Sequence, residues 1–270
     1  MDADLMGNLS AVPDFDSPPL DEVVVGVQFA TPLSYSTVYA NAVWQLYREE
    51  FPIVTEHPQL NPHFEVFGGN PEPRFEFGFG QPPLRNRLWF ISEDDSHLIQ
   101  FQDDRLLLNW RNRANGTPYP RHEKTQRTFA EYLKRLDALF KSEFNQGILI
   151  NQAEVSYINI IPVQSLAEMG DWLRFTPPPA FEIEGVNSVF GEVVRNDMHK
   201  PVARLTCETH SVTSPGGKQN AFRLTLSYRG APSQDSVDSA MEFISSGRTR
   251  IVKRFCDITT ESAQLSWGRN

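Results

Sequence analysis

Alternation of apolar and polar residues dominates this chain. In the segment 20–29, Val23, Val25, Val27 and Phe29 fall on one side of an extended backbone, which predicts a first strand. The segment 87–110 alternates three times, and acidic turn residues at 93–96 and 103–104 separate its runs. This pattern predicts a three-stranded antiparallel meander. Further alternating segments predict strands within 148–163 and over 188–196, 202–212 and 221–229.

A second period, close to 3.6 residues, predicts helices between these strands. It covers 36–50, 125–144 and 236–258, and the middle segment repeats Phe129, Leu133, Leu136 and Phe140 on one stripe. In the last helix Gly247 lies in the middle of the apolar stripe, where a missing side chain allows close approach to a sheet. A short helix is predicted to restart at 259–261 and to end near Trp267.

Strands grouped in runs, with helices between the runs, predict an α+β fold with a largely antiparallel sheet and packed helices. The first half reads strand, helix, meander, helix, strand, and the second half reads three strands and a long helix. The predicted organisation is a flexible acidic leader over 1–18, an N-terminal half over 19–164, a proline-rich connection over 165–180 and a C-terminal half over 181–270. No sequence repeat relates the two halves, and two arrangements stay open: separate halves, or structural echoes that share one sheet.

Composition narrows the class of protein further. Hydrophobic residues make up 40% of the 270 residues and charged residues 22%, which is ordinary for a globular protein. Six acidic residues precede the first basic one, so the net charge of −9 leaves only −3 for the rest of the chain. No apolar run approaches the roughly 20 residues that span a bilayer, and no signal peptide is evident. With two cysteines, the sequence predicts a cytoplasmic protein without membrane contact.

No motif carries chemistry at a diagnostic spacing. Cys207 and His210 lie three positions apart on a predicted strand, so they point to opposite faces and do not share a metal ion. The acidic pairs at 94–95 and 103–104 are typical of solvated turns. Nucleophile elbows, phosphate-binding loops and dinucleotide fingerprints are absent. We therefore predict no catalytic residue, no metal and no cofactor.

Two segments leave alternatives open. Arginines concentrate over 85–127 beside Trp89, Trp110 and Tyr119; they either form a solvated face or hold a phosphate or a nucleic acid. The proline-rich segment 51–83 contains Phe75, Phe77 and Phe79 at alternate positions. This triplet is predicted to seal the core, and the alternative is an exposed aromatic interface for a partner.

Several short stretches together resemble a sporadically distributed prokaryotic family of unknown function. They are PLDE before VVVGV at 19–27, LIQFQDDRLLLNW at 98–110, Tyr119-Pro120 and YINI at 157–160. The resemblance implies a free-standing cytoplasmic protein with an accessory or defence-type role. The polar residues of these stretches, together with two neighbouring arginines, are the candidate binding residues: Glu22, Arg87, Gln100, Asn109, Arg111, Tyr119 and Asn159.

Two functional hypotheses follow. The first is a non-catalytic binding or adaptor protein in a cytoplasmic complex, with a protein partner or a second copy of the chain. The alternative is a protein that binds a small ligand, nucleotide or nucleic acid in a pocket between sheet and helices, with or without catalysis. If such a pocket exists, Gln100, Asn109 and Asn159 are expected to converge in it, with Arg87 or Arg111 at its mouth.

Overall fold

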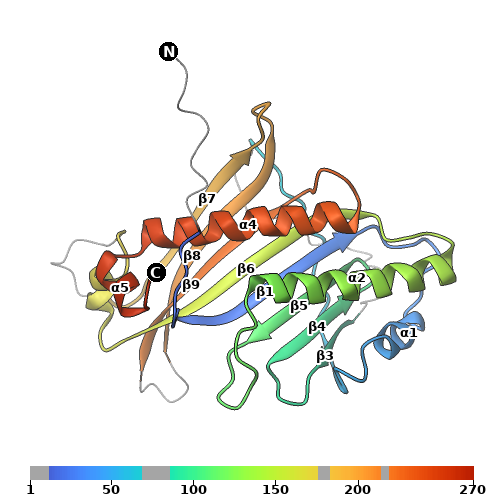
Figure 1. Ribbon diagram of the computed structural model, residues 1–270, viewed down its shortest axis with the longest axis horizontal. Coiled ribbons are helices and arrows are strands. Elements are labelled where there is room, and N and C mark those ends of the chain that lie inside the picture. The colour runs from blue at the N-terminus through green and yellow to red at the C-terminus, as the bar shows by residue number, and fades with distance from the viewer. Residues whose placement is uncertain (1–11, 69–85, 176–182, 214–218) are drawn as a thin grey trace.

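A computed structural model describes residues 12–68, 86–175, 183–213 and 219–270. In this part of the chain one antiparallel sheet of nine strands has the order β2-β3-β4-β5-β1-β6-β9-β8-β7 (Figure 1). The α+β prediction is confirmed. The strands are β1 (Leu20–Phe29), β2 (Ile53–His57), β3 (Arg87–Ile91), β4 (His97–Gln102), β5 (Arg105–Arg111), β6 (Ile150–Val163), β7 (Asn187–Arg195), β8 (Pro201–Thr213) and β9 (Asn220–Gly230).

The two central strands join the two halves of the chain. β1 pairs with β6, and each of them also pairs with the last strand of its own meander, β5 and β9 respectively. Each half therefore runs from a central strand through a short helix to a meander and then to a long helix. The helices are α1 (Tyr39–Gln45), α2 (His122–Phe144), α3 (Met169–Trp172), α4 (Val237–Ile258) and α5 (Glu261–Ser266).

The two long helices lie over the same face of the sheet (Figure 1). The apolar stripe of α2 is buried completely, since Phe129, Leu133 and Leu136 have no exposed surface and Phe140 is 1% exposed. These side chains share one core with the helix-facing residues of the sheet, among them Val25, Ile99 and Leu108. Alternation along the strands thus places one apolar face under the helices.

Gly247 brings α4 close to the sheet, as its place in the stripe predicts. A β-carbon added there meets Tyr228 Cδ1 at 2.4 Å and Val155 Cγ1 at 2.8 Å. Since real β-carbons do not approach other atoms so closely, only glycine fits at this contact without movement of the helix or the strands.

The opposite face of the sheet is crossed by an irregular segment, residues 58–66, which we call the strap. Gln102 exchanges two hydrogen bonds of 2.9 Å with the backbone N–H and C=O of Leu60, and the His63 N–H donates to Gln28 Oε1 at 3.0 Å. Farther along, Arg204 donates to Glu65 at 2.7 Å. The strap therefore runs from β4 across β1 to β8, where side chains of the sheet satisfy its backbone groups.

Three expectations from the sequence need correction. The helix predicted over 36–50 covers only Tyr39–Gln45, and the segment after it adds the edge strand β2, which was not predicted. The connection predicted over 165–180 contains a 3₁₀ turn at Leu166–Glu168 and α3. The elements in these two segments are short, and their few apolar positions give no periodic signal.

Residues 12–18, placed in the flexible leader by the sequence analysis, are fixed by the other end of the chain. The N–H groups of Asp16 and Ser17 donate to the carbonyls of Gly268 and Trp267 at 3.1 and 3.0 Å. Phe15 is 6% exposed and packs edge-on against Phe255, with ring centroids 5.5 Å apart. We call this segment the roof, because it covers the cavity described below.

Within the described residues, no helix is both long and apolar enough to cross a membrane.

Candidate functional site

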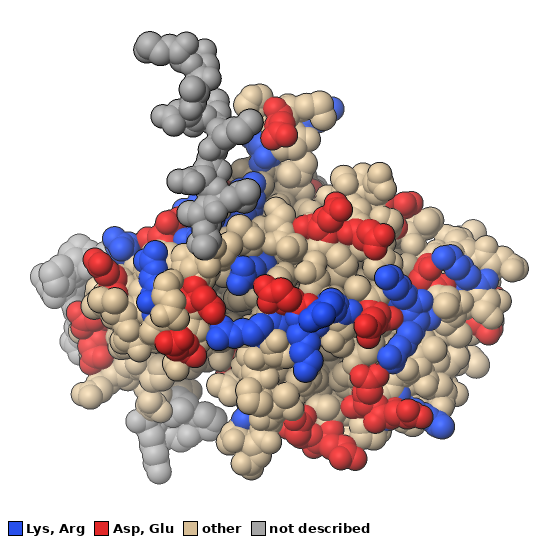
Figure 2. Space-filling view, in the orientation of Figure 1, with Lys and Arg blue, Asp and Glu red and all other residues tan. Residues whose placement is uncertain are grey.

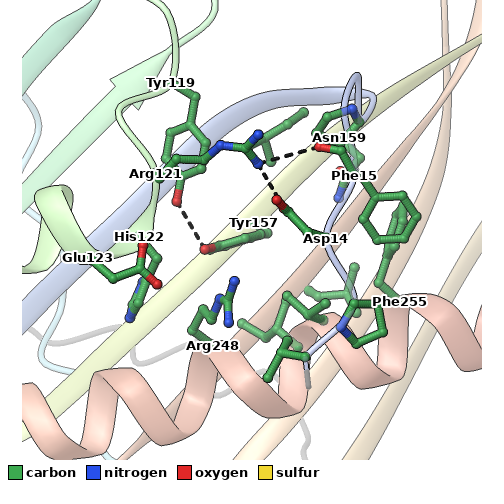
Figure 3. Close-up of a pocket in the computed structure, with 17 residues that line it drawn as sticks. Asp14, Phe15, Tyr119, Arg121, His122, Glu123, Tyr157, Asn159, Arg248 and Phe255 are labelled. Carbon is green, nitrogen blue, oxygen red and sulfur yellow. Dashed lines mark hydrogen bonds and ion pairs between the residues drawn. The ribbon is translucent and has the colours of Figure 1, made fainter. Parts of the chain in front are cut away.

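A cavity of about 460 Å³ lies between the sheet, the start of α2 and the middle of α4, beneath the roof (Figure 3). Its size falls in the usual range of small-molecule pockets, roughly 300–1,000 Å³. One part of its wall is apolar and the other polar. The apolar part comprises Val12, Phe15, Leu20, Leu226, Ile251, Val252 and Phe255, and the polar part comprises Tyr119, Arg121, His122, Glu123, Tyr157, Asn159 and Arg248.

Two tyrosines from different elements meet at the polar end. Tyr157 projects from the helix-facing side of β6, and Tyr119 comes from the loop that leads into α2. Their hydroxyl groups form a hydrogen bond of 3.0 Å. Burial raises the pKa of both, and for Tyr157 the hydrogen bond with Tyr119 and the positive charge of Arg248 oppose this rise. Both hydroxyl groups therefore stay protonated at neutral pH, and since one proton is used in the bond between them, the pair has one hydrogen-bond donor left.

His122 is the first residue of α2 and is 5% exposed, yet neither of its ring nitrogens has a hydrogen-bond partner. Burial, followed by the positive charge of Arg248, lowers its pKa from 6.5 to about 4, although Glu123 acts in the opposite direction. The ring is therefore neutral at pH 7, with one donor and one acceptor nitrogen. A buried polar side chain without partners is uncommon in folded proteins and points to a missing partner.

Arg248 extends from α4 toward the same space beside Tyr157 (Figure 3). Its Nε atom is buried without a hydrogen-bond partner, and no carboxylate in the described part of the chain forms an ion pair with it. The other arginine of the wall, Arg121, differs because it pairs with Asp14 of the roof at 2.8 Å. That ion pair joins the roof to the start of α2.

The structure divides the predicted binding residues between the two faces of the sheet. Tyr119 and Asn159 line the cavity on the helix-facing side, where Asn159 Nδ2 donates to the carbonyl of Leu224 at 3.2 Å. Glu22, Arg87, Gln100 and Asn109 lie on the opposite face, so the expected convergence of Asn159 with Gln100 and Asn109 is wrong. Asn159 is an odd position of β6 like Val155 and Tyr157, which face the helices.

Gln100 and Asn109 do converge with each other, in a row of hydrogen bonds across four strands. Arg87 Nη1 donates to Gln100 Oε1 at 2.8 Å, Gln100 Nε2 to Asn109 Oδ1 at 2.9 Å, and Asn109 Nδ2 to Glu22 Oε1 at 2.6 Å. The row runs from a cation on β3 to a carboxylate on β1, and all its donors point in one direction. Both amides are at most 7% exposed, and their functional groups are satisfied by their neighbours. The row borders a shallow groove of about 310 Å³ on this face.

Arg111 lies near this row, but its charge is neutralised. It forms an ion pair with Asp95, to which Arg113 also donates at 2.7 Å. Carboxylates likewise pair with Arg105 and Arg121 of the arginine-rich segment. In Figure 2, basic and acidic side chains are interspersed over the face that carries α2 and α4. Most described arginines of the segment 85–127 thus have an internal partner, which favours the solvated-face interpretation.

The structure does not describe residues 69–85, so the predicted aromatic interface of Phe75, Phe77 and Phe79 lies outside it, as does Arg85. In the described part of the chain, no three His, Cys, Asp or Glu side chains are grouped as metal ligands.

The sequence analysis missed His122 and Arg248, two side chains of the cavity wall that carry buried nitrogen atoms without hydrogen-bond partners. A possible signal for His122 was its place at the start of a long helix directly after Tyr119-Pro120-Arg121. The signal for Arg248 was its place next to Gly247, where a basic residue interrupts the apolar stripe of α4. Neither signal shows that the two side chains meet, because 125 residues of chain separate them and only the fold brings them together.

The sequence matches no model of a known protein family and none of the curated proteins with which it was compared. The function is therefore argued from the geometry of the cavity.

Proposed function

We propose that this protein binds a small molecule in the cavity between the sheet, α2 and α4. The observation that carries the proposal is His122, a buried side chain on the cavity wall whose two ring nitrogens lack partners. A ligand that hydrogen-bonds this ring removes the cost of two unsatisfied polar atoms, roughly 1–3 kcal/mol for each.

The two parts of the wall support a ligand with two parts. Phe15, Ile251 and Phe255 offer apolar surface at one end, while Tyr119, Tyr157 and His122 offer hydrogen-bonding groups at the other. Small-molecule sites usually combine an apolar lining with a few converging polar groups. A molecule with a compact polar end and an apolar body fits this division.

The proposal is tested with a neutral fluorescent probe, N-phenylnaphthylamine, titrated into the purified protein. We expect saturable binding, and we expect Val252→Phe to weaken it, since Val252 lines the cavity and a larger side chain there occupies its space. Val54→Phe on β2 is the matched control, because Val54 is 41% exposed and lies outside the cavity. Val12→Phe fills the same cavity from the roof and serves if Val252→Phe does not fold.

Native mass spectrometry of the freshly purified protein gives an independent measurement. We expect an additional small-molecule mass that is released on denaturation and is reduced in both cavity-filling variants. Absence of probe binding together with an empty protein in the native spectrum contradicts the proposal. Equal binding by the wild type, Val252→Phe and Val12→Phe places the probe elsewhere and contradicts it too.

The adaptor hypothesis is the second candidate, and one observation favours it. β7 is an edge strand that pairs only with β8 among the described residues, and its Val189 and Phe190 are 61% and 53% exposed. An unpaired edge with apolar side chains can accept a strand from a partner. Phe190→Ser is expected to reduce co-purification of a partner without loss of thermal stability, whereas Leu265→Ser, at a site 67% exposed on α5, is expected to change neither.

A cytoplasmic location and an accessory or defence-type role in a prokaryote stay predictions from the sequence. Fractionation of the native host and a comparison of phage sensitivity with and without the gene test them.

A further inference from the structure

We infer that the ligand of the cavity is an organic anion, a carboxylate or a phosphate monoester with an apolar body, whose charged group binds between Arg248 and the first turn of α2. The inference rests on the proposed function and specifies the chemistry of its ligand.

The first argument is the balance of charge around the cavity. Two arginines line it, and Asp14 of the roof pairs with Arg121 at 2.8 Å. Arg248 has no such carboxylate in the described part of the chain, and its Nε is buried without a hydrogen-bond partner. Arg248 is half-buried, and a cation that is partly removed from water without a counter-ion is costly, so a ligand anion would supply the missing charge.

The second argument is the N-terminus of α2. This helix has 23 residues, and its N-cap Arg121 makes no side-chain cap hydrogen bond. The N–H groups of a first turn lack partners within the helix, and the helix dipole adds partial positive charge at the same place. An anion is the ligand that such an end favours. The adjacent His122 and Glu123 line the cavity, so this end of the helix borders the ligand space.

The third argument is independent of the helix dipole and comes from the His122 ring. It is 5% exposed, reaches into the same space as Arg248, and has two nitrogens without partners (Figure 3). An oxyanion accepts several hydrogen bonds at once, and the neutral ring can donate one of them. A hydroxyl of the Tyr119–Tyr157 pair can donate another.

A cationic ligand is the opposite possibility, because Glu123 also borders the cavity. Glu123 is exposed to solvent, however, whereas His122 and the Nε atom of Arg248 are buried. The buried groups act in the lower dielectric and therefore determine the preferred charge.

Calorimetric titration with four compounds of one chain length tests the inference: octanoate, octyl phosphate, octanol and octylamine. We expect at least one of the two anions to bind about tenfold tighter than octanol, the factor that one charge-assisted hydrogen bond supplies. Octylamine is expected to bind more weakly than octanol. The comparison of octanoate with octyl phosphate identifies which anionic group the site prefers.

Arg248→Met is expected to abolish the advantage of the anions while octanol binds as before. Lys253→Met is the matched control, since it removes one positive charge from the exposed side of α4 and is expected to change neither affinity. A melting curve confirms folding of each variant. If Arg248→Met does not fold, His122→Leu removes the other group proposed to bind the anion and is expected to reduce the advantage of the anions in the same titration.

The outcomes separate the inference from the proposed function. The inference of an anionic ligand is wrong if octanol binds as tightly as the anions, or if the folded Arg248→Met variant binds the anions as the wild type does. Either result leaves the proposed small-molecule site in place. If octylamine binds most tightly, the site prefers a cationic ligand, and the inference is wrong as well. Failure of all four compounds overturns it as well, and only failure of the neutral probe in addition removes the site.

Discussion

At the scale of single residues, His122 is a buried side chain of the cavity wall with two ring nitrogens that lack partners. It shares the wall of the cavity with Arg248 of α4, Glu123 of its own helix, and the Tyr119–Tyr157 pair from the loop and β6. Burial and the arginine favour the neutral form. A histidine whose pKa is lower in the folded than in the unfolded chain costs stability in acid, because only the unfolded chain then gains the proton.

We therefore expect the free energy of unfolding to fall as the pH drops from about 6.5 to about 4, the pKa of folded His122. The full effect of this one group is at most roughly 3 kcal/mol. His122→Gln removes the titrating ring and is expected to flatten this part of the stability curve, as measured by urea unfolding at a series of pH values. His57 and His97, whose pKa values are also lowered by burial, and the carboxyl groups of Glu65 and Asp94, in which burial is outweighed by hydrogen bonds that lower the pKa values, titrate in both proteins and contribute to the remaining slope. Parallel curves for the two proteins contradict the assignment.

Gln102 shows how a buried amide can replace a backbone partner. It is 1% exposed, and its side chain bonds both the N–H and the C=O of Leu60, as a neighbouring strand would do. Gln102→Leu leaves both groups of the strap without these bonds, and we expect a loss of roughly 1–3 kcal/mol in the free energy of unfolding. Hydrogen exchange at the Leu60 amide should become faster. Gln164→Leu, at an exposed position, is the control and should have almost no effect.

At the scale of elements, alternation was sufficient to find most strands. It predicted β1 with its observed bounds and every strand of the meander, because each has a buried face that demands period 2. It missed β2, whose first four residues are exposed and therefore carry no apolar pattern. Burial, which creates the pattern, is thus also what limits the prediction.

The contact of α4 with the sheet was predictable because burial of this helix creates an apolar stripe in which Gly247 lies. Gly247→Ala is expected to destabilise the protein by roughly 1–3 kcal/mol, since the clash with Tyr228 and Val155 outweighs the better helix propensity of alanine. Gly185→Ala is the control, because an added β-carbon there meets nothing closer than Ser211 Oγ at 3.6 Å. Thermal unfolding of the two variants measures the difference. Equal melting temperatures would mean that α4 moves away without cost.

At the scale of the whole molecule, the candidate site could not be read from the sequence. Patterns of periodicity tell which residues of a strand share a face, as Tyr157 and Asn159 of β6 do. They do not tell whether helices or a strap cover a given face, so Gln100 and Asn109 were assigned to the same pocket as Asn159. The cavity itself depends on contacts between the two ends of the chain, such as Asn270 with Asp16, 254 positions apart.

This closure of the chain predicts how a ligand enters. The roof covers the cavity, and it is attached by backbone bonds to the end of the chain, by Arg121 to α2, and by Phe15 to Phe255. The cavity is partly open to solvent, and transient detachment of the roof would widen this opening, because segments held by few buried contacts open most easily. The rate of ligand release should then follow the stability of the roof.

Phe15→Ala tests this dependence, because it removes the one buried aromatic contact between the roof and α4 while leaving the polar end of the cavity intact. We expect faster hydrogen exchange at the Asp16 and Ser17 amides and faster release of the bound neutral probe, measured by stopped-flow fluorescence. Phe64→Ala is the matched control, since Phe64 is 52% exposed on the strap, on the opposite face of the sheet. If Phe15→Ala accelerates hydrogen exchange at these amides but does not accelerate release of the probe, the ligand leaves by another path. The roof then only lines the site and does not control entry to it.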